Sequence, residues 1–122
     1  TIAGAGHPHP VIIEKNGTTR MITLKGRLIT DSMKFNSATI TTTLKPGDTI
    51  ILYTDGITEI EDQKGVMLGE DDLLFCNWIQ SIAAISQNPA ELCGNIFDNI
   101  VKHSSHNEIN DDVTILAVRF NG

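Results

Sequence analysis

The chain has 122 residues, 40% of them apolar, and a formal net charge of −6, which corresponds to one domain, or part of one, with a hydrophobic core. Its nine lysines and arginines are scattered, which argues against a surface for nucleic acid or an anionic membrane. No apolar stretch approaches the roughly 18 residues of a transmembrane helix.

The first ten residues predict a strand end followed by a loop. Residues 1–6 are small and apolar, as is typical of the end of a strand. His7 and His9 alternate with prolines, which favours an extended or turning backbone. Two interpretations are open for these histidines: a polar loop, which is favoured, and a fragment of a metal site.

Residues 11–15 and 18–24 are strand-like and flank Asn16-Gly17. This dipeptide between two strands predicts a β-hairpin with a type I′ turn. We therefore expect two antiparallel strands here.

A second hairpin is predicted directly afterwards. Residues 37–44 alternate between apolar and polar side chains, and residues 49–54 are β-branched, apolar or aromatic without a charge. A turn at residues 45–47, with proline and glycine in succession, would pair the two stretches. Two hairpins in tandem indicate an antiparallel sheet.

Asp55-Gly56 follows the uncharged stretch. A carboxylate after a buried strand needs a partner, a capping role or a metal, and no lysine or arginine lies close in sequence. Taken alone, the pair is more typical of a simple turn. Residues 57–69 then form a polar segment, for which a solvated turn with Lys64-Gly65 at its tip is predicted. A calcium loop is excluded, since its spacing would put Ile60 at the first ligand position.

Two amphipathic helices are predicted next. The first opens at residues 70–72 and carries an apolar stripe, which comprises Leu74, Trp78, Ile82 and Ile85, widened by Leu73, Phe75 and Ile79. The second has Asn88 as N-cap, Pro89 at its first position and Glu91 completing a capping box. Its apolar face comprises Leu92, Ile96, Phe97, Ile100 and Val101. Cys76 and Cys93 fall in these helices and are expected to be reduced thiols of a cytoplasmic protein.

Asp111 and Asp112 immediately precede an apolar strand at residues 113–120. Such a pair is either solvated or part of a site, and the two interpretations are equally weighted. If this strand and the one before Asp55 are antiparallel neighbours, the three carboxylates meet at one edge of the sheet. Oxygen ligands of this kind suit Mg²⁺ or Mn²⁺.

Several motifs occur in order along the chain. They are Ala5-Gly6-His7-Pro8, Pro46-Gly47-Asp48 leading to Leu52-Tyr53-Thr54-Asp55-Gly56-Ile57-Thr58-Glu59, Leu68-Gly69, and Asp111-Asp112-Val113-Thr114. This ordered set resembles the metal-dependent (PPM-type) serine/threonine phosphatases, and among them the bacterial SpoIIE and RsbU group. The resemblance covers essentially the whole chain.

The resemblance implies an α+β fold in which antiparallel sheets are flanked by helices. It implies that Asp55 and Asp111 belong to a two-metal centre for Mn²⁺ or Mg²⁺, with Asp112 as a further candidate ligand. Gly56 and His7 lie in the matched motifs without an assigned chemical role. The implied reaction uses a metal-generated hydroxide on phosphoserine or phosphothreonine of a bacterial regulatory protein, such as an anti-sigma-factor antagonist.

The match corresponds to the C-terminal half of the family's domain. Family members bring an early strand aspartate and a Gly-Asp…Gly-His-Gly segment from their N-terminal half, and neither occurs in this sequence. We therefore expect residues 1–122 to form a single partial domain that is inactive when isolated and that self-associates. The alternatives are a non-catalytic scaffold or partner-binding module of the same fold, and an unrelated β-rich binding domain.

Overall fold

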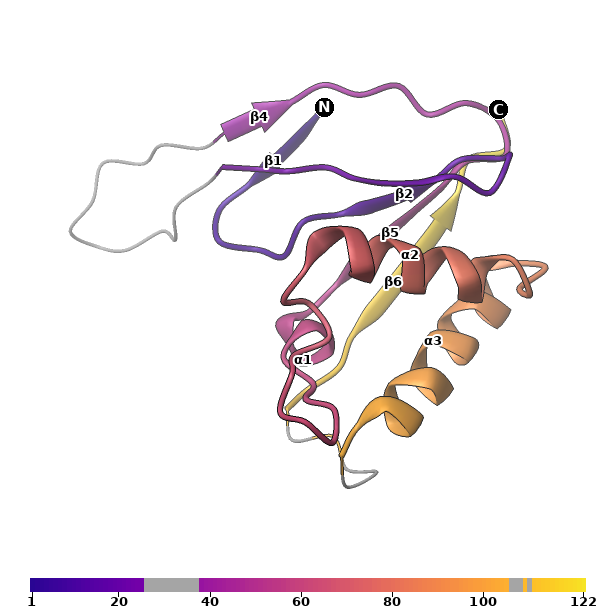
Figure 1. Cartoon of the computed structure of the whole chain (residues 1–122). Helices are drawn as coiled ribbons and strands as arrows, with labels where there is room; N and C mark the ends of the chain where they lie inside the picture. The colour runs from indigo at the N-terminus through magenta and orange to yellow at the C-terminus, as the bar shows by residue number, and fades with distance from the viewer. Residues whose placement is uncertain (26–37, 106–108, 110) are drawn as a thin grey trace.

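The structure is a computed structural model that describes residues 1–25, 38–105, 109 and 111–122 (Figure 1). Its strands are β1 (Ile2–Gly4), β2 (Val11–Ile13), β3 (Thr19–Met21), β4 (Ala38–Ile40), β5 (Thr49–Tyr53) and β6 (Ile115–Arg119). Its helices are α1 (Asp55–Thr58), α2 (Asp72–Ala83) and α3 (Pro89–His103).

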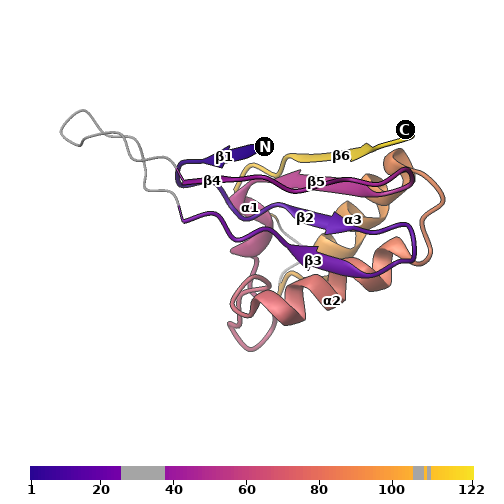
Figure 2. The same ribbon diagram turned by 90° about the horizontal axis from the view of Figure 1, so that it is seen from above.

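The strands form a two-stranded sheet, β1-β4, and a four-stranded sheet in the order β3-β2-β5-β6. Every strand pair among the described residues is antiparallel. Helices α2 and α3 lie on one side of the larger sheet, and β1 and β4 lie on the other side (Figure 1, Figure 2). This confirms the predicted α+β class, in which antiparallel sheets are flanked by helices, and both long helices pack on the same face.

The core consists of two clusters, one on each face of the larger sheet. Successive side chains of a strand point to opposite faces, so β2 and β5 contribute to both clusters. The helix-side cluster includes Val11, Ile13, Ile51 and Tyr53 together with Phe75, Ile79, Leu92, Ile96 and Ile100. The opposite cluster contains Ile12, Ile22 and Leu24, against which Ile2, Ile40, Leu44 and Ile50 pack. Strand β5 is therefore covered on both faces, as its uncharged sequence predicted.

The hairpin at Asn16-Gly17 is present, but its turn differs from the prediction. The amide of Gly17 donates to the carbonyl of Glu14 (2.8 Å), and the amide of Glu14 donates to the carbonyl of Thr18 (2.8 Å). The loop thus has three residues, and Gly17 adopts a φ of 90°. The type I′ prediction was wrong, because this loop needs only one left-handed residue and leaves that conformation to glycine.

The second predicted hairpin does not form. The turn at residues 45–47 is present, with the amide of Asp48 donating to the carbonyl of Lys45 (2.9 Å). However, β4 pairs with β1, whereas β5 pairs with β2 and β6. A strand has only two edges, and both edges of β5 are occupied, so this turn links two sheets. Residue 37, where the predicted strand began, lies outside the described residues.

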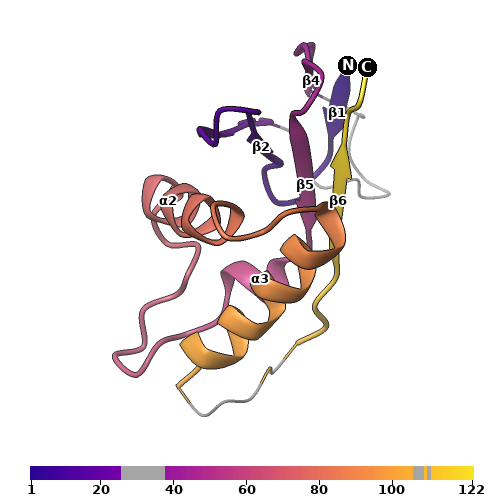
Figure 3. The same cartoon turned by 90° about the vertical axis from the view of Figure 1, so that its right-hand side faces the viewer.

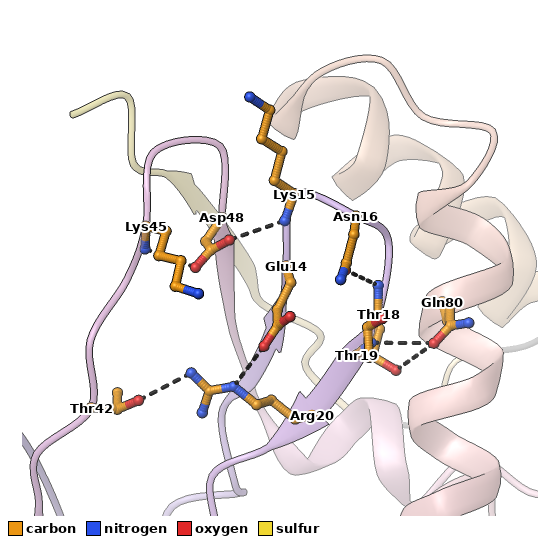
Figure 4. Close-up of polar contacts among 10 residues, drawn as sticks. All are labelled: Glu14, Lys15, Asn16, Thr18, Thr19, Arg20, Thr42, Lys45, Asp48 and Gln80. Carbon is orange, nitrogen blue, oxygen red and sulfur yellow. Dashed lines mark hydrogen bonds and ion pairs between the residues drawn. The ribbon is translucent and has the colours of Figure 1, made fainter.

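Asp48 ties this turn to the first hairpin (Figure 4). Its side chain is buried, with 4% exposure. One carboxylate oxygen accepts from the amide of Lys45 (2.8 Å) and the other from the amide of Lys15 (3.0 Å). The Lys45 amide holds the pKa of Asp48 below its ordinary value of 3.8, burial acts in the opposite direction, and the Lys15 amide adds to the lowering.

Helix α2 buries only one side of the predicted apolar stripe, to which Phe75, Ile79 and Ile82 belong. Its buried side chains are Phe75, Cys76, Ile79 and Ile82. Leu73, Leu74 and Ile85 are exposed by 69%, 66% and 68%. Leu74 and Phe75 begin two overlapping stripes of helical spacing, and the packing of Phe75 on Tyr53, with ring centroids 5.2 Å apart, decides between them.

Helix α3 begins as predicted. Asn88 accepts from the amide of Glu91 (2.9 Å), and the Glu91 carboxylate accepts from the amide of Gln87 (3.0 Å). Leu92, Ile96 and Ile100 are buried, which confirms the predicted face. Phe97 was expected in the core and is instead 46% exposed, because it lies at the margin of the apolar face.

Candidate functional site

The candidate site lies where β5 ends and β6 begins, at one end of the larger sheet (Figure 3). Tyr53 is opposite Ile115 in the antiparallel register. The pairing continues one step further, since the amide of Thr54 donates to the carbonyl of Thr114 (3.1 Å). Asp55 follows immediately as the first residue of α1. The sheet thus brings the backbone around Asp55 beside the segment that carries Asp111 and Asp112.

The hydroxyl of Thr54 holds the two segments together. It donates to the carbonyl of Asp112 (3.0 Å) and accepts from the amide of Thr114 (3.0 Å). Single-sequence patterns did not identify this residue, because its partners are about 60 positions away and become neighbours only through the register of β5 with β6.

Gly56 lies directly against this segment. It is buried, and a Cβ atom there would overlap the carbonyl oxygen of Asp112. Only a residue without a side chain therefore allows the start of α1 to approach the backbone at Asp112. The contact explains in physical terms why glycine follows Asp55.

The carboxylates of Asp55, Asp111 and Asp112 belong to exposed residues. Asp55 lines a pocket of about 370 Å³, which it shares with His7 and His9. Asp111 lines a different pocket, of about 410 Å³, which it shares with Gly56. One oxygen of Asp111 accepts from the amide of Asp112 (2.7 Å). The structure therefore brings the two segments together and assigns their carboxylates to two pockets.

The described residues do not form a complete metal site. Within residues 1–25, 38–105, 109 and 111–122, no group of three or more His, Cys, Asp or Glu side chains is arranged to hold a metal ion. The carboxylate oxygens of Asp55 and Asp111 are the donor type that Mg²⁺ and Mn²⁺ take. The oxygen donors are therefore of the right type for such an ion, but the described residues do not bring three of them together.

His9 has a structural role that the sequence did not reveal. Its Nδ1 accepts from the amide of Leu24 (3.2 Å), and its carbonyl accepts from the hydroxyl of Tyr53 (2.6 Å). These bonds fix the loop after β1 against β5 and against the segment that follows β3. Burial raises the pKa of the Tyr53 phenol, and the thiol of Cys76 and the carboxylate of Asp72 add to this effect.

Comparison with known proteins places these observations in a family. The model of the family described as Stage II sporulation protein E (SpoIIE) matches residues 1–121. The phosphoserine phosphatase RsbU of Bacillus subtilis (strain 168) is 26% identical over 122 residues, which cover 98% of this chain and 34% of that protein. The chain thus spans about a third of the length of this relative.

Solved structures agree with this comparison. The structure of the RsbU and RsbW domains of a Mycobacterium tuberculosis protein matches with a TM-score of 0.73 and 26% identity, over 96% of this chain and 31% of that one. The phosphatase domain of SpoIIE from Bacillus subtilis matches with a TM-score of 0.73 and 22% identity, over 98% of this chain and 49% of that one. Since the family model covers almost every residue, the chain belongs to the SpoIIE family.

Proposed function

We propose that the protein containing this chain is a metal-dependent phosphatase that hydrolyses phosphoserine or phosphothreonine on a bacterial regulatory protein, such as an anti-sigma-factor antagonist. The observation that carries the proposal is the alignment of Asp55 with the Asp111–Asp112 segment through Thr54. It occurs in a chain that belongs to the SpoIIE family. The similarity to a phosphoserine phosphatase supports the reaction class. The similarity to a protein with RsbU and RsbW domains supports a regulatory phosphoprotein as substrate.

In this proposal, Asp55 and Asp111 supply oxygen ligands to Mn²⁺ or Mg²⁺, and Asp112 is a secondary candidate. Bound metal of this kind lowers the pKa of a coordinated water and polarises a phosphoryl oxygen. Thr54 sets the distance between the two segments, and Gly56 allows their close approach. Because the described residues hold no group of three ligands, further ligands must come from other parts of the protein.

The second candidate is a non-catalytic module of the same fold that binds a partner protein. The lack of a three-ligand group among the described residues favours it. No helix in the described part of the chain is long and apolar enough to cross a membrane. We propose a cytoplasmic location under either function, where the free thiols of Cys76 and Cys93 stay reduced.

The test is phosphate release by the whole protein from a phosphoserine peptide in the presence of Mn²⁺. Asp55→Asn and Asp111→Asn should each lower kcat/KM by at least about a hundredfold, since each removes a charged metal ligand. Asp98→Asn is the matched control, because Asp98 is an exposed aspartate of α3 outside both pockets.

Full activity in either site variant would refute the assigned ligands. No phosphate release by the wild-type protein under any divalent metal would favour the non-catalytic module. Circular dichroism of each variant shows whether it is still folded, and so whether lost activity comes from the missing ligand or from unfolding.

A further inference from the structure

Helix α1, which begins at Asp55, lies between two close contacts that each involve a glycine. On one side, Gly56 lies against the backbone carbonyl of Asp112. On the other side, Gly69, in the segment that leads to α2, lies against Thr58, the last residue of α1. The four-residue turn that carries Asp55 is therefore held from both sides.

The contact between Gly69 and Thr58 leaves no room for a side chain. A Cβ atom at Gly69 would overlap the Cβ of Thr58 and would lie 2.7 Å from its Cγ2. Gly69 does not adopt a positive φ, so close approach, and not backbone conformation, is the reason for glycine here.

Hydrogen bonds connect this contact to Asp55. The amide of Gly69 donates to the carbonyl of Thr58 (2.8 Å). The hydroxyl of Thr58 donates in turn to the carbonyl of Asp55 (3.1 Å). A continuous path of short contacts thus runs from Gly69 through Thr58 to the residue that carries the candidate ligand.

The segment that contains Gly69 is itself anchored, so it can act as a stop for α1. The amide of Leu68 donates to the carbonyl of Ile60 (2.8 Å), and Glu61 and Met67 form an antiparallel bridge. Helix α2, which follows, buries four of its residues, whereas α1 buries two. A side chain forced between them should therefore displace α1, which is the less firmly anchored of the two.

Such a displacement would act directly on the candidate site. Gly69, Thr58 and Asp55 all line the pocket of about 370 Å³. A shift of α1 would move the Asp55 carboxylate relative to the segment that carries Asp111. In enzymes, a misplacement of about 1 Å can lower the rate about a hundredfold. The position of Asp55 thus depends on the absence of a side chain at Gly69.

We propose that Gly69 is a positioning residue for the reaction, and that its contact with Thr58 holds Asp55 where it can bind the metal. The inference rests on the proposed phosphatase function and deepens it, because it gives the glycine of the Leu68-Gly69 motif a role in the site. Gly69 has no side chain with which to bind metal or substrate, so it acts through Thr58.

The experiment measures Mn²⁺ binding to the whole protein by isothermal titration calorimetry, together with phosphate release from a phosphoserine peptide. Gly69→Ala should weaken Mn²⁺ binding about ten- to hundredfold, the range typical of changes just outside the ligand shell, and should lower kcat/KM to a similar extent. Gly94→Ala is the matched control, because a Cβ there meets nothing besides its chain neighbours and the backbone of its own helix. It should leave both quantities unchanged. Circular dichroism identifies a temperature at which each variant is folded.

A second substitution tests the contact itself. Thr58→Gly removes the Cβ and Cγ2 atoms that the new side chain of Gly69→Ala would meet. In this background, Gly69→Ala should weaken Mn²⁺ binding by less than about threefold, because the two changes are coupled. Thr58→Val keeps the shape of the side chain and removes its hydrogen bond to the Asp55 carbonyl, so it should weaken Mn²⁺ binding about fivefold.

The positioning role is refuted if folded Gly69→Ala binds Mn²⁺ as tightly as the wild type, or if its effect is the same in the Thr58→Gly background. If Gly69→Ala does not fold, Thr58→Val decides the question, and unchanged Mn²⁺ binding by that variant refutes the role. A wild-type protein that releases no phosphate with any divalent metal refutes the phosphatase function. An active wild type with an equally active Gly69→Ala refutes only the positioning role.

Discussion

Thr54 and Asp112, 58 positions apart in the sequence, are joined by a hydrogen bond of 3.0 Å from the Thr54 hydroxyl to the Asp112 carbonyl. The same hydroxyl accepts from the amide of Thr114 at 3.0 Å. One side chain therefore continues the pairing of β5 with β6 beyond the last strand residues. This extension aligns the two candidate ligand segments, which makes Thr54 a positioning residue.

Thr54→Val keeps the β-branched shape and removes both bonds of the hydroxyl. The free energy of unfolding should fall by about 1–3 kcal/mol, the sum expected for two hydrogen bonds in a partly buried setting. Urea denaturation measures this change. Thr23→Val, at an exposed position where the hydroxyl bonds to none of the described residues, should change this free energy by less than about 0.5 kcal/mol. Equal effects of the two substitutions would contradict the role of Thr54.

Gly56→Ala should destabilise the protein, because its Cβ would overlap the carbonyl oxygen of Asp112. Backbone oxygen cannot move aside as a flexible side chain does, so we expect a loss of about 1–3 kcal/mol. Gly94→Ala in α3 is the matched control, since nothing besides its chain neighbours and the backbone of its own helix lies within 4 Å of its Cβ position. That control should raise stability by about 0.5–1 kcal/mol through the helix preference of alanine. If thermal denaturation showed Gly56→Ala to be more stable than Gly94→Ala, the close approach of Gly56 to the Asp112 carbonyl would be disproved.

Asp48 should contribute to stability in a pH-dependent way. Its pKa in the folded state lies below the ordinary value of 3.8 because backbone amides of Lys45 and Lys15 donate to it. The contribution is therefore complete above pH 3.8 and is lost as the pH falls through the folded-state pKa. Asp48→Asn should lower the denaturation midpoint at neutral pH and weaken its fall on acidification. A mutant whose midpoint parallels that of the wild type at every pH would contradict this account.

The whole protein and the isolated 122-residue chain should differ in how their phosphatase activity responds to metal. Chelation with EDTA should abolish phosphate release by the whole protein, and excess Mn²⁺ or Mg²⁺ should restore it. The isolated chain should remain inactive with either ion, because its described residues hold no three-ligand group. Phosphatase activity of the isolated chain with Mn²⁺ would overturn this expectation.

Self-association of the isolated chain should depend on β6. This strand is at the edge of the larger sheet, and Leu116 and Val118 on its outward face are 51% and 49% exposed. Apolar side chains on an unpaired edge favour pairing with another chain. Sedimentation velocity should show concentration-dependent association that Val118→Lys reduces. A monomer at all micromolar concentrations would contradict the prediction.

The sequence alone determined the features that depend on near neighbours along the chain. Asn88, Pro89 and Glu91 predicted the start of α3 correctly, because the capping bonds span only a few residues. Gly17 marked a hairpin for the same reason. The ordered motifs around Asp55 and Asp111 also indicated the family that the comparisons then confirmed.

Only the tertiary structure decided which strands pair, which face of a helix is buried and which distant segments meet. Alternating side chains predicted a strand at residues 37–44 that pairs with the next strand, β5, whereas the structure has β4 at Ala38–Ile40 and pairs it with β1. Two helical stripes competed in α2, and contact between Phe75 and Tyr53 selected the buried one. The bonds of Thr54 to the segment at Asp112 required the register of β5 and β6. Local patterns report the conformation of a segment, whereas its partners depend on which surfaces remain available after the rest of the chain has packed.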